Sequence, residues 1–188
     1  NILWILDRIV LPSAIGGTFV RLGNLMNSEI NGKPSGDFFA GFKFVRDLSD
    51  NSVRGALQQT GITDPDKAID ALVNDPQYAE LLVGIPYKHP AQLYEAICYI
   101  GVFIILYLVY WKTEKRHKPG YLVGLFFVLL FMVRLLIENI KEAQTATDGF
   151  EFIGIHFNTG QLLSVPFILI GLFLMFRPDG MFKTNSSA

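Results

Sequence analysis

An arginine, three asparagines and a glutamate lie close together where a long apolar run of the sequence ends. The run covers residues 9–20, and Arg21-Leu22-Gly23-Asn24-Leu25-Met26-Asn27-Ser28-Glu29-Ile30-Asn31-Gly32 follows it. Ionisable side chains at membrane depth usually face a protein interior or a water-filled cavity, which makes them candidates for function. An arginine near a helix end can instead extend its head group to the membrane interface. Such an anchor needs no amides or carboxylate beside it, so we favour a functional site.

A second pair of ionisable residues occurs in a later apolar segment. Arg134 and Glu138 are four residues apart, which places them on the same face of a helix. One carboxylate satisfies only part of the five-donor guanidinium group, so an ion pair with Glu138 leaves donors of Arg134 for another anion. Arginine binds phosphate through two parallel hydrogen bonds, and Arg21 and Arg134 therefore suit a lipid phosphate. A purely structural ion pair between Arg134 and Glu138 is the alternative.

The composition and the lengths of the apolar blocks indicate an integral membrane protein. Of the 188 residues, 51% are hydrophobic, and they collect into blocks rather than spreading evenly. The blocks are about as long as the ~20 residues with which a helix crosses the hydrocarbon core of a bilayer. Pro12 and Gly16-Gly17 predict that the first block is kinked or in two pieces. We predict an all-α fold with four transmembrane segments, at residues 2–22, 91–111, 121–140 and 161–176.

The charges and the rare residue types argue against several functions. The formal net charge of −1 gives no support for nucleic-acid binding, which requires a basic face. One cysteine excludes an intrachain disulfide, and the three histidines and this cysteine show no metal-ligand spacing. No Gly-x-Ser-x-Gly elbow occurs, so a hydrolytic lipase is disfavoured. We therefore predict neither a metal nor another cofactor.

The basic loop at residues 112–118 sets the predicted orientation. It holds four Lys or Arg side chains against one acid, and short loops of this kind stay in the cytoplasm. Because successive transmembrane segments cross the membrane in opposite directions, a cytoplasmic loop at residues 112–118 means that the first segment runs from inside to outside. Arg21, at its end, then lies near the outer surface of the membrane. The loop at residues 141–160 has one Lys and three acids, a net charge of 1 − 3 = −2, which fits the outer side. Asp7-Arg8 then lies near the cytoplasmic end, as a structural ion pair or a helix anchor.

The chain divides into three predicted parts. Residues 1–32 form a kinked membrane segment with the polar motif, residues 33–88 a water-side insertion or cap, and residues 89–188 a three-helix membrane region with a cytoplasmic tail. In the insertion, Asp64-Pro65 and Asp75-Pro76 are each typical of an N-cap followed by proline at the first helical position. The insertion is thus predicted to be mainly helical, with a solubilising loop as the alternative. The predicted apolar faces are Ala68, Ile69, Leu72 and Val73 after the first pair and Tyr78, Leu81 and Leu82 after the second.

Four blocks of residues in order along the chain carry a resemblance. They are Asp7 and Gly16 with residues 21–32, His89-Pro90-Ala91-Gln92-Leu93-Tyr94-Glu95, Arg134-Leu135-Leu136-Ile137-Glu138, and Gly160-Gln161-Leu162-Leu163-Ser164. Together they resemble the bacterial prolipoprotein diacylglyceryl transferase family. The resemblance implies an inner-membrane enzyme. In the orientation predicted from the basic loop, this multi-pass enzyme has a periplasmic insertion and an active site toward the outer leaflet. It implies transfer of the diacylglyceryl group of phosphatidylglycerol to the lipobox cysteine thiol of a preprolipoprotein signal peptide, forming a thioether and releasing glycerol phosphate.

The resemblance and the chemistry together assign roles to individual residues. The reaction expels a phosphate, and preorganised cations in a water-poor site stabilise the charge that develops on it. We therefore predict that Arg21 and Arg134 are catalytic and that Glu138 holds Arg134 in position. The predicted phosphatidylglycerol-binding residues are Arg21, Asn24, Asn27, Glu29, Gly32 and Arg134, and the predicted supporting residues are Asp7, Gln92, Tyr94, Glu95 and Gln161.

The incoming thiol must lose its proton, so the reaction requires a base. His89 is the candidate in this chain, and a hydrogen bond at the start of a helix is its alternative role. The family also has an upstream His-Gly-Gly motif whose histidine has been considered the base. The chain starts at Asn1 without that motif, so we expect it to correspond to the C-terminal two-thirds of a family member.

Two functions without this chemistry remain as alternatives. A lipid or small-molecule transporter is the first, because broken helices and buried arginines also mark transport paths. Internal repeats would favour transport, and the sequence shows none. A structural membrane subunit is the second, in which Arg21 and Arg134 would serve assembly. For the transferase, the predicted partners are phosphatidylglycerol, other membrane lipids and the preprolipoprotein, with no nucleic acid.

Overall fold

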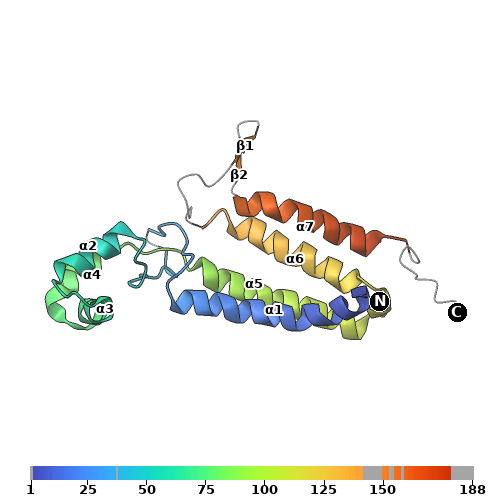
Figure 1. Cartoon of the computed structure of the whole chain (residues 1–188), viewed down its shortest axis with the longest axis horizontal. Coiled ribbons are helices and arrows are strands. Elements are labelled where there is room, and N and C mark those ends of the chain that lie inside the picture. Colours follow the sequence, from blue (N-terminus) through green and yellow to red (C-terminus); the bar gives the residue numbers. More distant parts are fainter. Residues whose placement is uncertain (1, 37, 142–149, 153–154, 158, 179–188) are drawn as a thin grey trace. The chain divides into compact units, whose positions relative to one another are not determined.

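Helices make up most of the computed structural model, which describes residues 2–36, 38–141, 150–152, 155–157 and 159–178 (Figure 1). The all-α prediction holds for these residues except for one short hairpin, which lies in the predicted loop 141–160. In the hairpin, β1 and β2 pair antiparallel with Glu151 opposite His156. The described elements are α1 (Ile2–Met26), α2 (Asn51–Gln59), α3 (Pro65–Asn74), η1 (Pro76–Tyr78), α4 (Ala79–Gly84), α5 (Ala91–Lys112), η2 (Glu114–His117), α6 (Tyr121–Ile137), β1 (Phe150–Phe152), β2 (Ile155–Phe157) and α7 (Thr159–Phe176).

Two of the described helices are long and apolar enough to cross a membrane. They are α1, with 25 residues, and α5, with 22. At 1.5 Å per residue their lengths are about 37 and 33 Å. Each of the other two predicted segments is also an apolar helix, but α6 and the Gly160–Phe176 part of α7 are shorter. Helix α1 continues without a break through Pro12, so of the two predicted forms, kinked or in two pieces, the structure excludes the second.

The chain forms two compact units. The first consists of Asn1–Phe19, Glu95–Asn139 and Thr147–Ala188, and the second of Val20–Tyr94 and Ile140–Ala146. Helices α1 and α5 each continue from one unit into the other. The polar stretch at the end of α1 and the helical cap belong to the second unit, whereas most of the apolar helical residues belong to the first.

Apolar contacts hold the helices of the first unit together. Side chains of α1, α5 and α6 form its buried core, and Figure 1 shows α6 and α7 side by side. Gly124 and Gly171 allow the backbones of α6 and α7 to approach closely, because a Cβ on either would lie 2.6 Å from the carbonyl oxygen of the other. The buried core residues are Val10, Ala14, Val102, Leu106, Leu122 and Val123.

Asp7 is buried and caps helix α6. Its carboxylate accepts hydrogen bonds from the backbone amides of Gly120, at 2.6 Å, and Val123, at 2.9 Å. These amides are at the N-terminal end of α6, where a helix leaves donors without partners and favours a negative charge. The neighbouring Arg8 donates to the carbonyl oxygen of Trp4 and lies over its ring. The interpretation of Asp7 as a helix anchor is thus confirmed, and the helix that it anchors is α6.

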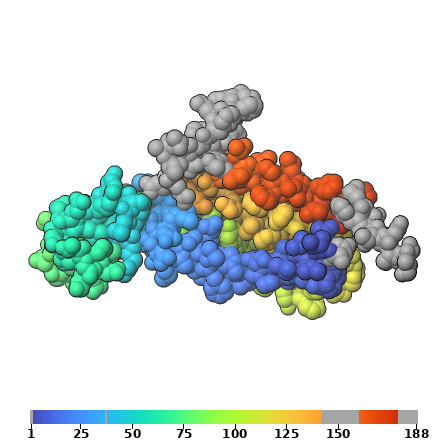
Figure 2. Space-filling view, viewed as in Figure 1, coloured from blue at the N-terminus to red at the C-terminus, as the bar shows by residue number. Residues whose placement is uncertain are grey.

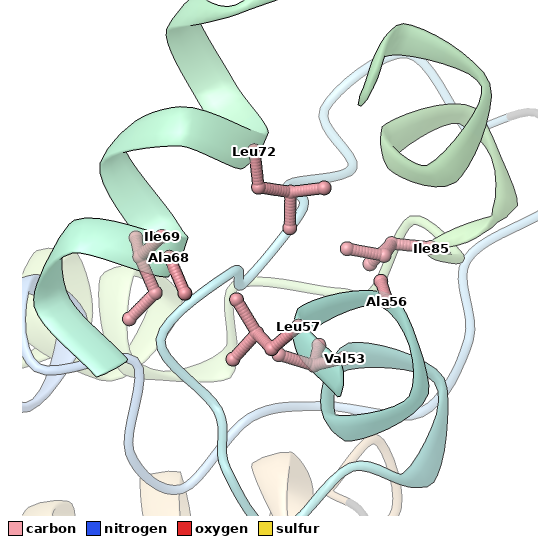
Figure 3. Close-up of a cluster of buried hydrophobic side chains, with 7 residues drawn as sticks. All are labelled: Val53, Ala56, Leu57, Ala68, Ile69, Leu72 and Ile85. Atoms are coloured by element: carbon pink, nitrogen blue, oxygen red, sulfur yellow. The ribbon is translucent and has the colours of Figure 1, made fainter. Parts of the chain in front are cut away.

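Helices α2, α3 and α4 of the second unit pack around a small core of their own (Figure 3), and we use the name helical cap for these three helices only as a label. Asp64 accepts hydrogen bonds from two amides at the start of α3, and Asp75 accepts one at the start of η1, so both Asp-Pro predictions are confirmed. The sequence analysis missed α2, whose N-cap is Asp50. It also wrongly placed Val73, which is 48% exposed, on the apolar face. In Figure 2, α2, α3 and α4 appear in cyan and green as one closely packed body. The buried core residues are Val53, Ala56, Leu57, Ala68, Ile69, Leu72 and Ile85.

Candidate functional site

The polar stretch forms the C-terminal end of α1 and the loop after it. The backbone amide of Glu29 donates to the oxygen of Asn24 at 2.9 Å, and that of Ser28 donates to the oxygen of Leu25 at 3.2 Å. This pair of bonds is a Schellman motif, which ends a helix through one residue in the left-handed conformation. Ser28 occupies that position with a φ of 57°, where glycine is the usual residue. Arg21 therefore lies in the last turns of α1, directly before the chain reverses.

Ile30 also adopts the left-handed conformation, with a φ of 61°. A β-branched residue rarely does so, because its side chain crowds the backbone. Residues held in this region cost on the order of 1–3 kcal/mol and persist only where the surroundings fix them, often at functional sites. The loop of residues 28–31, which we call the signature loop, therefore depends on contacts from elsewhere in the chain.

Two buried amide side chains supply these contacts. The Nε2 atom of Gln92 donates to the backbone oxygen of Glu29 at 2.5 Å and to Oδ1 of Asn31 at 2.7 Å. The Nδ2 atom of Asn31 donates to the backbone oxygen of Ser28 at 2.9 Å and to the carboxylate of Asp47 at 2.8 Å. Gln92 is fully buried and Asn31 is 6% exposed. The amides thus hold the carbonyl groups of the signature loop in fixed positions.

Lys88 connects this network to the helical cap. Its ammonium nitrogen lies 2.7 Å from the carboxylate of Asp50 and 3.5 Å from that of Asp47, and its side chain is only 5% exposed. Burial disfavours the charged carboxylates, but hydrogen bonds and the Lys88 charge outweigh it, so the pKa of each aspartate lies below its ordinary value. For Asp47 the hydrogen bonds come from Ser49 and Asn31.

The lowered pKa values predict a loss of cap stability in acid. Asp47 and Asp50 bind fewer protons in the folded than in the unfolded chain, so they stabilise the fold above their ordinary pKa of 3.8. This contribution is lost as the pH falls through the folded pKa values. We expect the amides of α2 to lose hydrogen-exchange protection as the pH is lowered from about 5 toward 2, after correction for intrinsic exchange. An Asp47→Asn, Asp50→Asn double variant should lose most of this pH dependence, and equal dependence in both proteins would contradict the interpretation.

Gly32 and His89 bring the first two sequence blocks together. The amide of Gly32 donates to the oxygen of His89 at 2.9 Å, and the amide of His89 donates to the oxygen of Lys33 at 3.0 Å. A Cβ on Gly32 would lie 2.6 Å from the His89 oxygen, so the contact requires glycine. The Nδ1 atom of His89 lies 3.3 Å from the hydroxyl of Tyr94 in the first turn of α5. The hydrogen bond that the sequence suggested at the helix start is thus present.

A cavity of about 560 Å³ opens beside the signature loop. Residues 27–31 form one part of its lining, and residues 46–50 with Lys88 form the other. Its volume is within the range of ligand pockets, and its lining is more polar than is usual for them. Asn27 and Glu29, two of the predicted site residues, line this cavity.

The other predicted constellation lies in the first unit, at the C-terminal end of α6. Nε of Arg134 is buried and has no hydrogen-bond partner among the described residues. Glu138 is the C-cap residue of α6, and its carboxylate lies at the N-terminal end of α7, which favours a negative charge. A Cβ on Gly160 would lie 2.8 Å from both carboxylate oxygens, so glycine makes room for them. Nearby, Nε2 of Gln161 donates to Oδ1 of Asn139 at 3.1 Å.

The structure thus places the predicted site residues in two groups. One group is in the second unit, and the other is in the first unit, where Asp7 and Arg134 lie at opposite ends of α6. The sequence analysis included Asn31 in the polar stretch but gave it no role, and it missed Asp47, Asp50 and Lys88. A signal existed for Asp50 as the N-cap of α2. The second-unit residues are Arg21, Asn24, Asn27, Glu29, Gly32, His89, Gln92 and Tyr94, and the first-unit residues are Asp7, Glu95, Arg134, Glu138 and Gln161.

Helices α1 and α5 are long and apolar enough to span a bilayer, and a polar loop with buried side chains follows α1. This arrangement is consistent with a membrane protein that has a polar site. The family model described as prolipoprotein diacylglyceryl transferase matches residues 1–177. The chain belongs to this family.

Individual relatives agree with the family match. The phosphatidylglycerol–prolipoprotein diacylglyceryl transferase of Porphyromonas gingivalis is 35% identical over 179 residues, which cover 94% of this chain and 53% of the relative. The protein of the same name from Tolumonas auensis is 36% identical over 173 residues, which cover 92% of this chain and 51% of the relative. The chain thus spans about half the length of the curated relatives that it matches, rather than the two-thirds expected from the sequence.

Proposed function

We propose that this chain forms part of a phosphatidylglycerol–prolipoprotein diacylglyceryl transferase. The enzyme transfers the diacylglyceryl group of phosphatidylglycerol to the lipobox cysteine thiol of a preprolipoprotein. The observation that carries the proposal is the family match over residues 1–177, which includes all four sequence blocks. The signature loop supports it, because strained backbone held by buried side chains is typical of functional sites.

The proposal includes a multi-pass arrangement in the bacterial inner membrane. Helices α1, α5, α6 and α7 cross the bilayer, the basic loop at residues 112–118 is cytoplasmic and the cap is periplasmic. With 17 residues, α6 is about 26 Å long, and a modest local thinning of the bilayer accommodates it. A cysteine placed at Asp66 should react with an impermeant thiol reagent added outside, and one at Lys115 should not. The reverse labelling would overturn this orientation.

The proposed reaction is a displacement at a glycerol carbon. The thiolate sulfur attacks the carbon that carries the phosphate oxygen, a C–S bond forms and the C–O bond breaks with its electron pair on the leaving glycerol phosphate. Arg21 and Arg134 stabilise the developing negative charge. The buried Nε of Arg134 supports this role, because burial strengthens its interaction with an anion.

The remaining predicted residues have supporting roles in the proposal. Glu138 joins the end of α6 to the start of α7 and so fixes the segment that carries Arg134. His89 takes the thiol proton on Nε2, which requires that its Nδ1–H donates to the hydroxyl of Tyr94. Asn24 and Gly32 shape the backbone around the end of α1. Gln92 holds the signature loop by its hydrogen bond to Glu29.

Mass spectrometry of a lipobox-cysteine peptide tests the function directly. The full-length protein in phosphatidylglycerol membranes should add one diacylglyceryl unit to the peptide. Arg21→Ala and Arg134→Ala should abolish the addition, His89→Gln should slow it strongly, and Arg54→Ala, on the exposed surface of α2, should leave it unchanged. Movement of lipid across the membrane without a covalent product would reject the transferase in favour of the transporter.

A further inference from the structure

We propose that the cavity beside the signature loop binds the polypeptide substrate, at a polar and positively charged segment next to the lipobox cysteine. This inference rests on the proposed function for the identity of the substrate. It departs from the sequence-based prediction for two residues, because Asn27 and Glu29 then contact the polypeptide rather than phosphatidylglycerol.

The charges around the cavity argue against a phosphate ligand. Three carboxylates and two cationic side chains line it. The ammonium of Lys88 is already within 3.5 Å of both Asp47 and Asp50. The guanidinium of Arg46 lies 3.1 Å from Asp66, which is outside the cavity. Both cations are therefore engaged, and the exposed carboxylate of Glu29 leaves the cavity with a negative charge.

The chemistry of the lining also favours a polypeptide over a lipid chain. Asn27 offers an amide, and the hydroxyl oxygen of Ser49, whose proton is donated to Asp47, can still accept a hydrogen bond. The loop backbone adds further polar groups, and all of these suit peptide groups and polar side chains. An acyl chain would leave such groups without hydrogen bonds, at a free-energy cost. The buried bonds from Gln92 and Asn31 fix one wall of the cavity before a ligand arrives, which reduces the entropy lost on binding.

Leu48 offers a direct test of the charge argument. It lines the cavity and is 49% exposed, so lysine fits there without disturbing a core. Val73 on α3 is 48% exposed and lies outside the cavity, which makes Val73→Lys a matched control. A new positive charge in the cavity should repel a cationic peptide, whereas the same charge on α3 should have little effect.

The experiment measures binding separately from turnover. Fluorescent lipobox peptides with serine in place of the cysteine cannot react, and they carry either two lysines or two glutamates after that position. Their affinity for the full-length protein in phosphatidylcholine membranes is measured by anisotropy. We expect about 10-fold tighter binding of the lysine peptide, and Leu48→Lys should remove this preference while Val73→Lys keeps it.

Transfer to the cysteine forms of both peptides is then measured in phosphatidylglycerol membranes. Leu48→Lys should raise the KM for the lysine peptide about 10-fold and leave the KM for phosphatidylglycerol unchanged. Equal affinities of both peptides, equal effects of the two lysine variants, or an altered KM for phosphatidylglycerol would overturn the inference. If the protein prefers the lysine peptide but transfers no diacylglyceryl group to either peptide, the proposed function would be rejected and the peptide-binding site would still be supported.

Discussion

Replacing Arg21 with lysine should lower the rate of diacylglyceryl transfer by about 100-fold, although the positive charge is kept. A guanidinium group presents a planar set of donors that matches two phosphate oxygens, whereas an ammonium group is a single flexible point charge. Arg21 lies in the last turns of α1, directly before the Schellman motif and the signature loop. The backbone of residue 21 is therefore held in a fixed position. A lysine there cannot make the two parallel hydrogen bonds that the guanidinium group makes to the phosphate.

The rate is measured as diacylglyceryl peptide formed per unit time at saturating phosphatidylglycerol, by mass spectrometry. Arg54→Lys is the matched control, because Arg54 lies on the exposed surface of α2 and bonds to the side chain of Asn51. It should retain the full rate. Full activity of Arg21→Lys would show that charge alone is sufficient, and a two-bond contact with phosphate would then be wrong.

Replacing Gly32 with alanine should destabilise the second unit by about 3 kcal/mol and abolish most transfer activity. The added Cβ would lie 2.6 Å from the backbone oxygen of His89 and 3.1 Å from that of Ile140. Both clashing atoms belong to the backbone, which cannot rotate away as a side chain can. The clash is removed only if the segment of Gly32 and Lys33 moves away from His89, which would break the two backbone hydrogen bonds between them. The signature loop directly before Gly32 would then lose its shape.

Gly23→Ala is the matched control within the same sequence motif. A Cβ on Gly23 meets nothing within 4 Å, and alanine within α1 should be neutral or stabilising by about 0.5–1 kcal/mol. Stability is measured by denaturant unfolding, with hydrogen exchange of the amides of residues 28–33 as the local probe. Similar stabilities for the two alanine variants would show that the contact around Gly32 is not tight.

Several features of the fold were predictable because their signals are local. Asp64 and Asp75 cap helices whose amides lie two or three residues further along, so the Asp-Pro pairs were sufficient to identify them. The apolar blocks likewise identified α5 and most of α1, because hydrophobicity over about 20 residues reflects the thickness of a bilayer. Helix α2 was missed because its sequence, Asn-Ser-Val-Arg-Gly-Ala-Leu-Gln-Gln, is largely polar and gains its stability from packing on the cap core.

The sequence by itself indicated the membrane character, four candidate segments, the two helix starts at Asp64-Pro65 and Asp75-Pro76, and the residues of the signature stretch. Only the tertiary structure decided what holds that stretch in place. Lys88 forms ion pairs with Asp47 and Asp50, which lie about forty residues earlier in the sequence. Asp7 caps α6 by accepting a hydrogen bond from Gly120, 113 residues later. A helix cap involves residues two or three positions apart, and the apolar face of a helix repeats with the helical period, so both can be recognised in the sequence. A hydrogen bond or ion pair between distant residues leaves no such period in the sequence, so it is fixed only when the chain packs.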